Sequence, residues 1–272
     1  MNDTQIETLV VLPFAGRFGN MFIQAINSLS LAIKYNIPSI HFPNNFSFFL
    51  NEGKIKNTKL SLKSCETCEI CETENAFYDT FFYKKQKEYY EHTLSYYECA
   101  KLLSGLLKFR IDAIPEKGNI LHIHFRSGDV FKENPHPKYA QPPASFYKKI
   151  ISQETWSEVV LVYENENNPC ISEIKKFLNK NNILFRTQSS SMLDDINEIL
   201  LATSLISSNG SFIHPMINIS KNLKNLYYFN SWSYRKDINI HKYESNKYIS
   251  FWENTKEQID IMLTFSRYLD YQ

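Results

Sequence analysis

The chain has 272 residues, a formal net charge of +1 and a hydrophobic content of 43%, which supports a packed core and fits one large domain or two domains of about 130 residues. The balanced charge creates no field that would attract nucleic acid. The apolar runs are far shorter than the roughly 18 residues of a membrane span and the polar start of the chain does not resemble a signal peptide, so we expect a cytoplasmic protein with at most peripheral membrane association.

The start of the chain predicts a β-turn-α-β unit. Residues 8–13 are apolar and predict a buried strand, and residues 14–20 predict a glycine-containing turn. Residues 21–35 carry apolar side chains at helical spacing. Pro38 follows that helix, and residues 39–42 predict the next strand.

The next region has no clear period. Residues 44–92 are polar and aromatic, and we interpret them as irregular, either an inserted subdomain or a set of loops. Residues 94–113 predict a helix, and the break at 115–118 predicts a domain boundary.

Three cysteines in this region form the pattern C-x-x-C-x-x-C. Cys65, Cys68 and Cys71 have a spacing that allows metal binding, with His92 as a possible fourth ligand. No second C-x-x-C pair and no H-x-x-x-H motif completes a zinc pattern. We therefore favour free thiols in a reducing cytoplasm and predict no metal.

Strand and helix patterns alternate in the second half of the chain. Strands are expected at residues 120–125, 158–163, 183–186, 204–208 and 225–229. Helices are expected at residues 144–152, 169–180, from the cap at Ser191 to 202, after the turn at 209–211, and within 248–270. Such alternation is typical of parallel sheets with helices on both faces.

The fold class we predict is therefore α/β, with two Rossmann-type halves facing a cleft. Residues 1–117 would form the first domain and 118–245 the second. Residues 246–272 would form a terminal helix that packs back across both halves.

The hexapeptide from His124 to Asp129 carries the strongest chemical signal. His124 and Arg126 lie two apart at the end of a strand, so they share one face. Arg126 is suited to bridging phosphate oxygens with a charge-assisted fork, and His124 to bonding a base, a ribose or a phosphate. The alternative is a buried histidine beside a salt bridge between Arg126 and Asp129.

Two further segments follow predicted strands. The turn containing Gly16, Arg17, Gly19 and Asn20 lets backbone approach a ligand and adds one charge, although it is neither a dinucleotide fingerprint nor a Walker loop. Residues 207–211 offer a phosphate nest or, alternatively, a helix N-cap cluster; the candidates there are Ser208, Asn209 and Ser211.

Two carboxylates precede the second of these segments. Asp194 and Asp195 either cap their own helix or accept hydrogen bonds from a base or a ribose.

The three segments together resemble the fucosyltransferase superfamily of GT-B enzymes. Its bacterial α1,2 group carries an early Gly-Gly-Leu-Gly-Asn-Gln-x-Phe-Gln turn, which is matched by Gly19, Asn20 and Gln24. The group then carries His-x-Arg-Arg-Gly-Asp, which is matched by His124, Arg126, Gly128 and Asp129. Ser127 replaces the second arginine of that motif, so the linkage is not assigned. The segment 194–212 is similar to the third motif of the group.

The resemblance implies a metal-independent inverting glycosyltransferase that uses a nucleotide sugar, GDP-fucose above all, and no other cofactor. Residues 118–245 would bind the donor, with Arg126 on the diphosphate, His124 and Asp194 or Asp195 on the nucleoside, and Ser208 or Ser211 on phosphate. The turn from Gly16 to Asn20 would close over the donor from residues 1–117, the acceptor side.

Groups after Arg126 are candidates for the general base that the acceptor hydroxyl needs. They are Asp129, Glu133 and His136, although Asp129 is equally suited to bracing Arg126. The proline-rich loop 136–143 is either a structural crossover or an acceptor wall, in which Tyr139 would stack on a sugar beside Gln141.

We expect the acceptor to be an oligosaccharide or lipid-linked glycan, as in polysaccharide biosynthesis. The alternatives are transfer of another activated group from a nucleotide diphosphate, or non-catalytic binding of a nucleotide or glycan.

Overall fold

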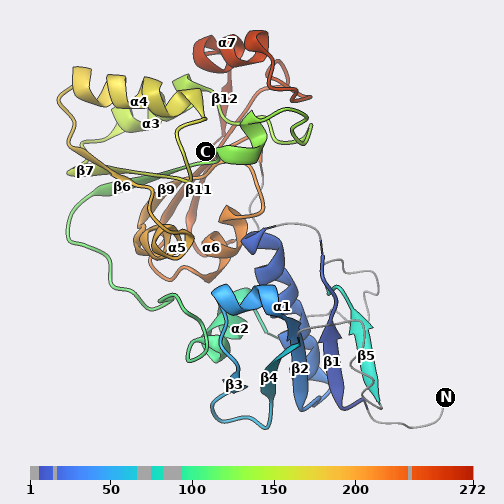
Figure 1. Ribbon diagram of the computed structural model, residues 1–272. Helices are drawn as coiled ribbons and strands as arrows, with labels where there is room; N and C mark the ends of the chain where they lie inside the picture. Colours follow the sequence, from blue (N-terminus) through green and yellow to red (C-terminus); the bar gives the residue numbers. More distant parts are fainter. Residues whose placement is uncertain (1–5, 15–16, 66–74, 82–93, 232–234, 272) are drawn as a thin grey trace. The chain divides into compact units, whose positions relative to one another are not determined.

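The computed structural model describes residues 6–14, 17–65, 75–81, 94–231 and 235–271. The chain divides into two compact units, and the division falls between Ile111 and Asp112. Each unit is built around a mostly parallel sheet with helices packed on it (Figure 1). The predicted α/β class is confirmed.

The first unit holds a five-stranded sheet in the order β3-β4-β2-β1-β5. Its strands are parallel except β3, which runs antiparallel to β4. The elements are β1 (Thr8–Val11), α1 (Phe18–Lys34), β2 (Ser39–Pro43), the 3-10 helix η1 (Asn44–Phe48), β3 (Gly53–Lys54), β4 (Ser61–Cys65), β5 (Ala76–Asp79) and α2 (Tyr96–Leu103).

The interpretation of residues 44–92 as irregular is wrong for the described part of that region. β4 pairs in parallel with β2, and β5 pairs in parallel with β1. The reason is tertiary: Leu62 is buried beside Ile40 in the register of the two strands, while its neighbours along β4 are polar.

Helix α2 is shorter than predicted because turns and bends follow it, and their apolar side chains pack into the first unit. Leu107 forms a bridge with Leu50, and Phe109 joins an aromatic cluster with Phe18 and Phe22. The Phe18 ring also meets the Phe49 ring edge-on at 5.3 Å. This packing buries Phe18, so α1 begins there and Gly19 and Asn20 lie in its first turn, not in the predicted loop.

Two amides of α1 fill the space at the carboxyl ends of β1 and β5. Gln24 Nε2 donates hydrogen bonds to the carbonyl oxygens of Leu12 (3.0 Å) and Thr80 (2.5 Å). Asn27 Nδ2 donates to the carbonyl of Phe81 at 2.7 Å. Both side chains are almost fully buried, so these bonds satisfy backbone groups that water does not reach.

The second unit holds a seven-stranded sheet in the order β12-β11-β10-β9-β6-β7-β8. All of its strands are parallel except β12. The elements are β6 (Ile120–Phe125), η2 (Gly128–Phe131), α3 (Ala144–Gln153), β7 (Glu158–Tyr163), α4 (Pro169–Lys180), β8 (Phe185–Gln188), α5 (Met192–Leu201), β9 (Ser204–Ile206), α6 (Ile213–Ile219), β10 (Asn225–Phe229), β11 (Asn239–Glu244), α7 (Lys256–Thr264) and β12 (Leu269–Tyr271).

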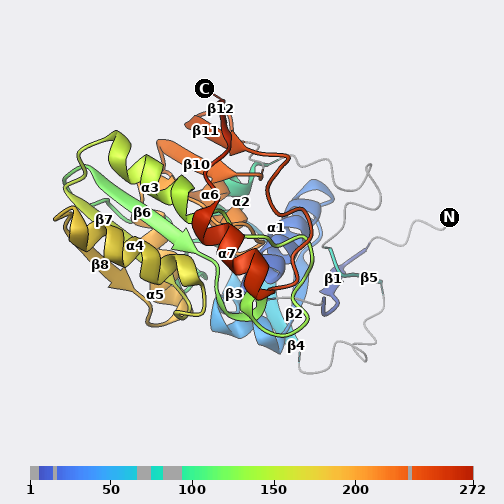
Figure 2. The same cartoon turned by 90° about the horizontal axis from the view of Figure 1, so that it is seen from above.

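Helices cover both faces of this sheet. α3, α4 and α7 pack against one another on one face, and α5 and α6 lie on the other (Figures 1 and 2). Leu121, Ile123 and Phe125 of β6 belong to the core beneath the first group. Because side chains alternate along a strand, His122 and His124 point to the face that α5 and α6 cover.

The end of the chain differs from the predicted long helix. Helix α7 spans nine residues, and Thr255 caps it by accepting a hydrogen bond from the Gln258 amide. The strand β11 was not predicted, because its residues are mostly half-buried and polar. The segment 246–272 belongs to the second unit, where α7 packs on α3 and α4. In the part of the chain that the structure describes, no helix is long and apolar enough to cross a membrane.

Candidate functional site

Strand order in the second unit defines a switch point between β6 and β9. From β6 the chain moves outward through β7 and β8, and then returns to add β9, β10 and β11 on the other side. Ligands of open α/β sheets bind at the carboxyl ends of the strands at such a point. The residues that follow β6 and β9 therefore form the candidate site.

The structure brings His124 and Ser208 together at this point. His124 Nδ1 lies 2.7 Å from Ser208 Oγ, and the imidazole stacks on Phe212 with ring centroids 5.2 Å apart. Burial, with a smaller effect from the nearby Arg126 charge, lowers the pKa of His124 to about 3. The ring is thus neutral near pH 7, and it serves as a hydrogen-bonding group, not as a cation.

Arg126 is held on several sides. Its guanidinium carbon lies 4.3 Å from the centre of the Tyr139 ring, a cation–π distance. On another side it crosses Gly210, where an added Cβ would collide with Nη1. Nη2 donates to both carboxylate oxygens of Asp129 at 3.3 and 3.2 Å. Asp129 therefore braces Arg126 in this structure.

The same site contains two buried polar atoms without a hydrogen-bond partner among the described residues. They are Nε of Arg126 and Oδ1 of Asn209. Because burying a polar group without a partner is unfavourable, a polar ligand that reached these two atoms would restore their hydrogen bonding.

The loop 136–143 is fastened to the turn after β9. Gln141 is fully buried; its Nε2 donates to the carbonyls of Tyr139 (2.8 Å) and Asn209 (3.1 Å), and its Oε1 accepts from the Asn209 amide at 3.3 Å. Asn209 Nδ2 donates to the Ala140 carbonyl at 2.8 Å. These bonds explain how Tyr139 is placed over Arg126.

The serines near α6 do not cap that helix. Its N-cap is Phe212, without a side-chain capping bond, and Ser211 is half-buried just before it. Ser208 bonds to His124 instead.

Ser127, which replaces an arginine of the resembled motif, anchors the neighbouring loop. Its hydroxyl accepts a hydrogen bond from the Asn165 amide at 3.2 Å, and the Gly128 amide donates to Asn165 Oδ1 at 3.2 Å. Gly128 has φ of +69°, a conformation that favours glycine. The segment after β6 is thereby tied to the loop after β7.

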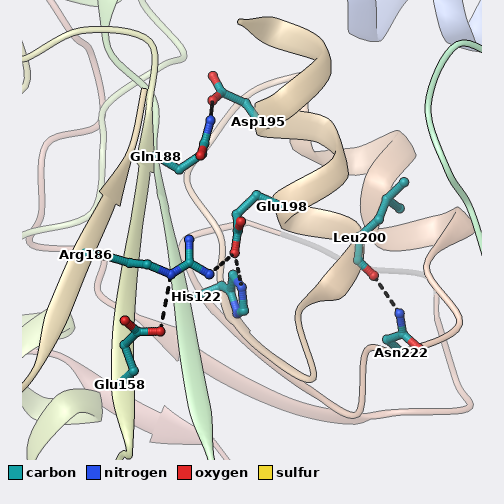
Figure 3. Close-up of polar contacts among 8 residues, drawn as sticks. All are labelled: His122, Glu158, Arg186, Gln188, Asp195, Glu198, Leu200 and Asn222. Carbon is teal, nitrogen blue, oxygen red and sulfur yellow. Dashed lines mark hydrogen bonds and ion pairs between the residues drawn. The ribbon is translucent and has the colours of Figure 1, made fainter. Parts of the chain in front are cut away.

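Asp194 and Asp195 lie at the carboxyl end of β8. Asp194 is exposed and accepts from the hydroxyls of Ser191 (2.7 Å) and Ser190 (2.9 Å), bonds that lower its pKa. Asp195 accepts from Gln188 Nε2 at 3.2 Å (Figure 3), and burial raises its pKa to about 6. Within the described residues, no hydrogen bond or ion pair joins either carboxylate to the His124–Arg126 site.

The other predicted residues lie on exposed loops or in the first unit. Glu133 and His136 are exposed, and the His136 ring packs 4.5 Å from the Tyr139 ring. Arg17 is the exposed N-cap of α1, and Gly16 lies outside the described residues.

A buried polar network was not predicted from the sequence. His122 Nε2 lies 2.9 Å from Glu198 Oε1, which also accepts from Arg186 at 2.7 Å, and Arg186 reaches Glu158 at 3.2 Å (Figure 3). Burial alone would raise the pKa of Glu198, but hydrogen bonds from His122 and Arg186 outweigh it and lower the pKa to about 2. The sequence signal that could have found this network is the spacing of His122 and His124, which lie two positions apart on one strand and therefore share a face of the sheet.

The cysteine pattern is described only in part. Cys65 ends β4 and is buried, whereas Cys68, Cys71 and His92 lie outside the described residues. The described ranges contain no group of three His, Cys, Asp or Glu side chains placed to hold a metal.

The fold of the chain is similar to that of known protein structures. No protein-family model and no curated protein matches the chain. The chain is similar to a crystal structure of POFUT1 in complex with GDP-fucose, with a TM-score of 0.50 and 12% identity over 85% of this chain and 99% of that chain. It also matches the bacterial iron-containing dodecameric glycosyltransferase TibC from enterotoxigenic E. coli, with a TM-score of 0.48 and 8% identity over 96% of this chain and 73% of that one. The likeness to POFUT1 confirms the predicted GT-B-like architecture, and at this identity it shows the fold alone.

Proposed function

We propose that this chain is an inverting glycosyltransferase that moves a sugar from a GDP-sugar, GDP-fucose first among them, to a hydroxyl of a cell-surface glycan. The observation that carries the proposal is Arg126: a guanidinium fixed at a switch point, with a buried Nε lacking a partner among the described residues. The fold it shares with a structure that holds GDP-fucose supports the same choice of donor.

In the proposed reaction the acceptor oxygen attacks the anomeric carbon while the bond from that carbon to the diphosphate oxygen breaks. The electron pair leaves on GDP, so negative charge grows on the diphosphate. Arg126 faces that charge, and a fixed cation stabilises it without reorganising during the reaction. The proposal therefore needs no metal and no further cofactor.

The remaining donor contacts follow from the site. Neutral His124 and one of Asp194 or Asp195 would bond the nucleoside, and the phosphates would lie against Ser208, Asn209 and Ser211.

The acceptor proton must pass to a base. Asp129 is engaged by Arg126, whereas Glu133 and His136 are exposed on the following loop, so we assign the base to one of these two. The outer side of Tyr139 would meet the acceptor sugar. The buried Gln141 would act there by holding Tyr139 in place. We place the reaction in the cytoplasm, within polysaccharide biosynthesis.

A thermal-shift series with GDP, UDP, CMP and ADP tests the proposal. GDP is expected to raise the melting temperature more than the other three nucleotides. A ligand at about 100 times its Kd stabilises the folded state by about 2.7 kcal/mol. Consumption of GDP-fucose with release of GDP, in the presence of an acceptor panel, then separates a transferase from a binding protein. Failure of all four nucleotides to stabilise the chain would overturn the proposal.

A further inference from the structure

A large hollow lies at the carboxyl edge of the second sheet, beyond the His124–Arg126 site. Its volume is about 980 Å³, and the loops after β10 and β11 and the residues before β12 line it. Since the strands are parallel, this is the same edge of the sheet that carries His124 and Arg126. None of its lining residues has a role in the donor site.

The walls of the hollow are held by specific hydrogen bonds. The Asn230 side chain donates to the Ser245 carbonyl at 3.1 Å and accepts from the Ser245 amide at 2.9 Å. The Tyr268 hydroxyl donates to the Ser145 carbonyl at 3.0 Å. The hollow is therefore formed before any ligand arrives, which lowers the ordering cost of binding.

The unpaired charge in the hollow is positive. Lys247 and Arg267 are exposed in its lining, and neither forms an ion pair with another described residue. The acidic residue of the lining, Glu244, is already paired with Lys242. Two unpaired cations beside serine and asparagine side chains fit an anionic, hydroxyl-rich ligand.

A short chain of contacts connects the hollow to the proposed donor site. The buried Tyr248 of the hollow donates its hydroxyl to the Gln141 carbonyl at 2.6 Å. Gln141 in turn bonds Asn209, next to Ser208 and Gly210. Two residues, Tyr248 and Gln141, thus connect a ligand in the hollow to the groups that hold Arg126.

We propose that this hollow binds a carboxylate or phosphate group carried by the acceptor glycan, with Lys247 and Arg267 as its charge partners. The inference rests on the proposed function, because it assigns the ligand as the acceptor. It adds a selection rule: acidic sugars are preferred over neutral sugars of the same size.

The test compares acidic probes with neutral ones by isothermal titration at low salt. Lactose is paired with 3′-sialyllactose for the carboxylate, and mannose with mannose 6-phosphate for the phosphate. The full-length protein is expected to bind one acidic probe at least about fivefold more tightly than its neutral partner. The probe that shows the difference identifies which anion the hollow takes.

Variants assign the effect to the hollow. Lys247→Met with Arg267→Met is expected to abolish the acidic preference. The matched control, Lys176→Met with Lys180→Met, removes two exposed cations from α4 and is expected to keep it. Equal binding of acidic and neutral probes, or equal loss in the control variant, would overturn the inference.

A parallel GDP thermal shift on the same proteins keeps the two proposals apart. Both double variants are expected to retain the GDP shift, because neither changes a donor-site residue. A wild-type protein that prefers acidic sugars but ignores every nucleotide would overturn the proposed transferase while leaving the anion site in place.

Discussion

The two sheets share a strand order but differ in what occupies their switch points. Around the first strand of each unit the order is β4-β2-β1-β5 and β8-β7-β6-β9. In the first unit, the neutral amides of Gln24 and Asn27 close the space by bonding backbone carbonyls. In the second unit, the same position presents His124 and Arg126.

Side chains, not strand order, therefore make the site. Gln24 matches a residue of the resembled family motif, yet in this structure its amide bonds backbone and stabilises the first unit. The Arg126 guanidinium, in contrast, is charged and hydrogen-bonds the half-exposed side chain of Asp129. We therefore predict that substitutions at the second switch point affect ligand binding, whereas substitutions at the first affect stability.

The largest expected effect is that of Arg126→Ala. Removing a fixed cation from the leaving group is expected to lower turnover of GDP-fucose by at least about tenfold. Arg126→Lys is expected to recover only part of the rate, because lysine lacks the bidentate fork. Initial rates at saturating acceptor measure both, and an unchanged rate in Arg126→Ala would contradict the role given to this residue.

A smaller loss is expected for Gly210→Ala. The added methyl group collides with Arg126, and φ of +152° is strained for any residue with a Cβ. We expect GDP affinity to fall by roughly three- to tenfold, together with about 1–3 kcal/mol of stability. GDP titration and urea unfolding measure the two effects. Full GDP affinity in this variant would show that Arg126 does not need its present position.

Gln24→Ala tests the stabilising role of the first switch point. It leaves the carbonyls of Leu12 and Thr80 without their donor, so unfolding is expected to become about 1–3 kcal/mol easier. The GDP-induced shift in melting temperature is expected to persist. A variant of normal stability that no longer responds to GDP would reverse the roles of the two switch points.

The smallest effect is expected for Glu198→Gln, and it appears in the pH dependence of stability. Since folding lowers the pKa of Glu198 from 4.5 to about 2, its contribution is present above pH 4.5 and is lost as the pH falls toward 2. The variant is expected to show a flatter decline in unfolding free energy over this window. Chemical unfolding at a series of pH values checks it, and parallel curves for both proteins would contradict the assigned network.

Much of the second unit could be predicted from local sequence. β6, β7, α4 and β10 have the predicted bounds because apolar runs and an N-terminal proline set them. β4, β5 and β11 were missed since their residues are polar or half-buried, and only pairing with neighbouring strands makes them strands. The local pattern of apolar and polar residues gives no information about that pairing.

The site could be predicted only in part, because the local sequence also says nothing about contacts between distant residues. The sequence places His124 and Arg126 on one strand end, but their contacts come from residues far along the chain. The hydrogen bond from Ser208 spans 84 positions, and the link between Gln141 and Asn209 spans 68. Tyr139 was singled out as an acceptor contact, whereas its ring covers Arg126, a contact that depends on how the loop folds back.

A crystal structure of the protein with GDP would show directly whether Arg126 binds the diphosphate. We predict diphosphate oxygens within hydrogen-bond distance of the Arg126 guanidinium, and a polar ligand atom at Asn209 Oδ1. GDP bound elsewhere, with the ring of Tyr139 and the carboxylate of Asp129 as the sole partners of the Arg126 guanidinium, would contradict this role for Arg126.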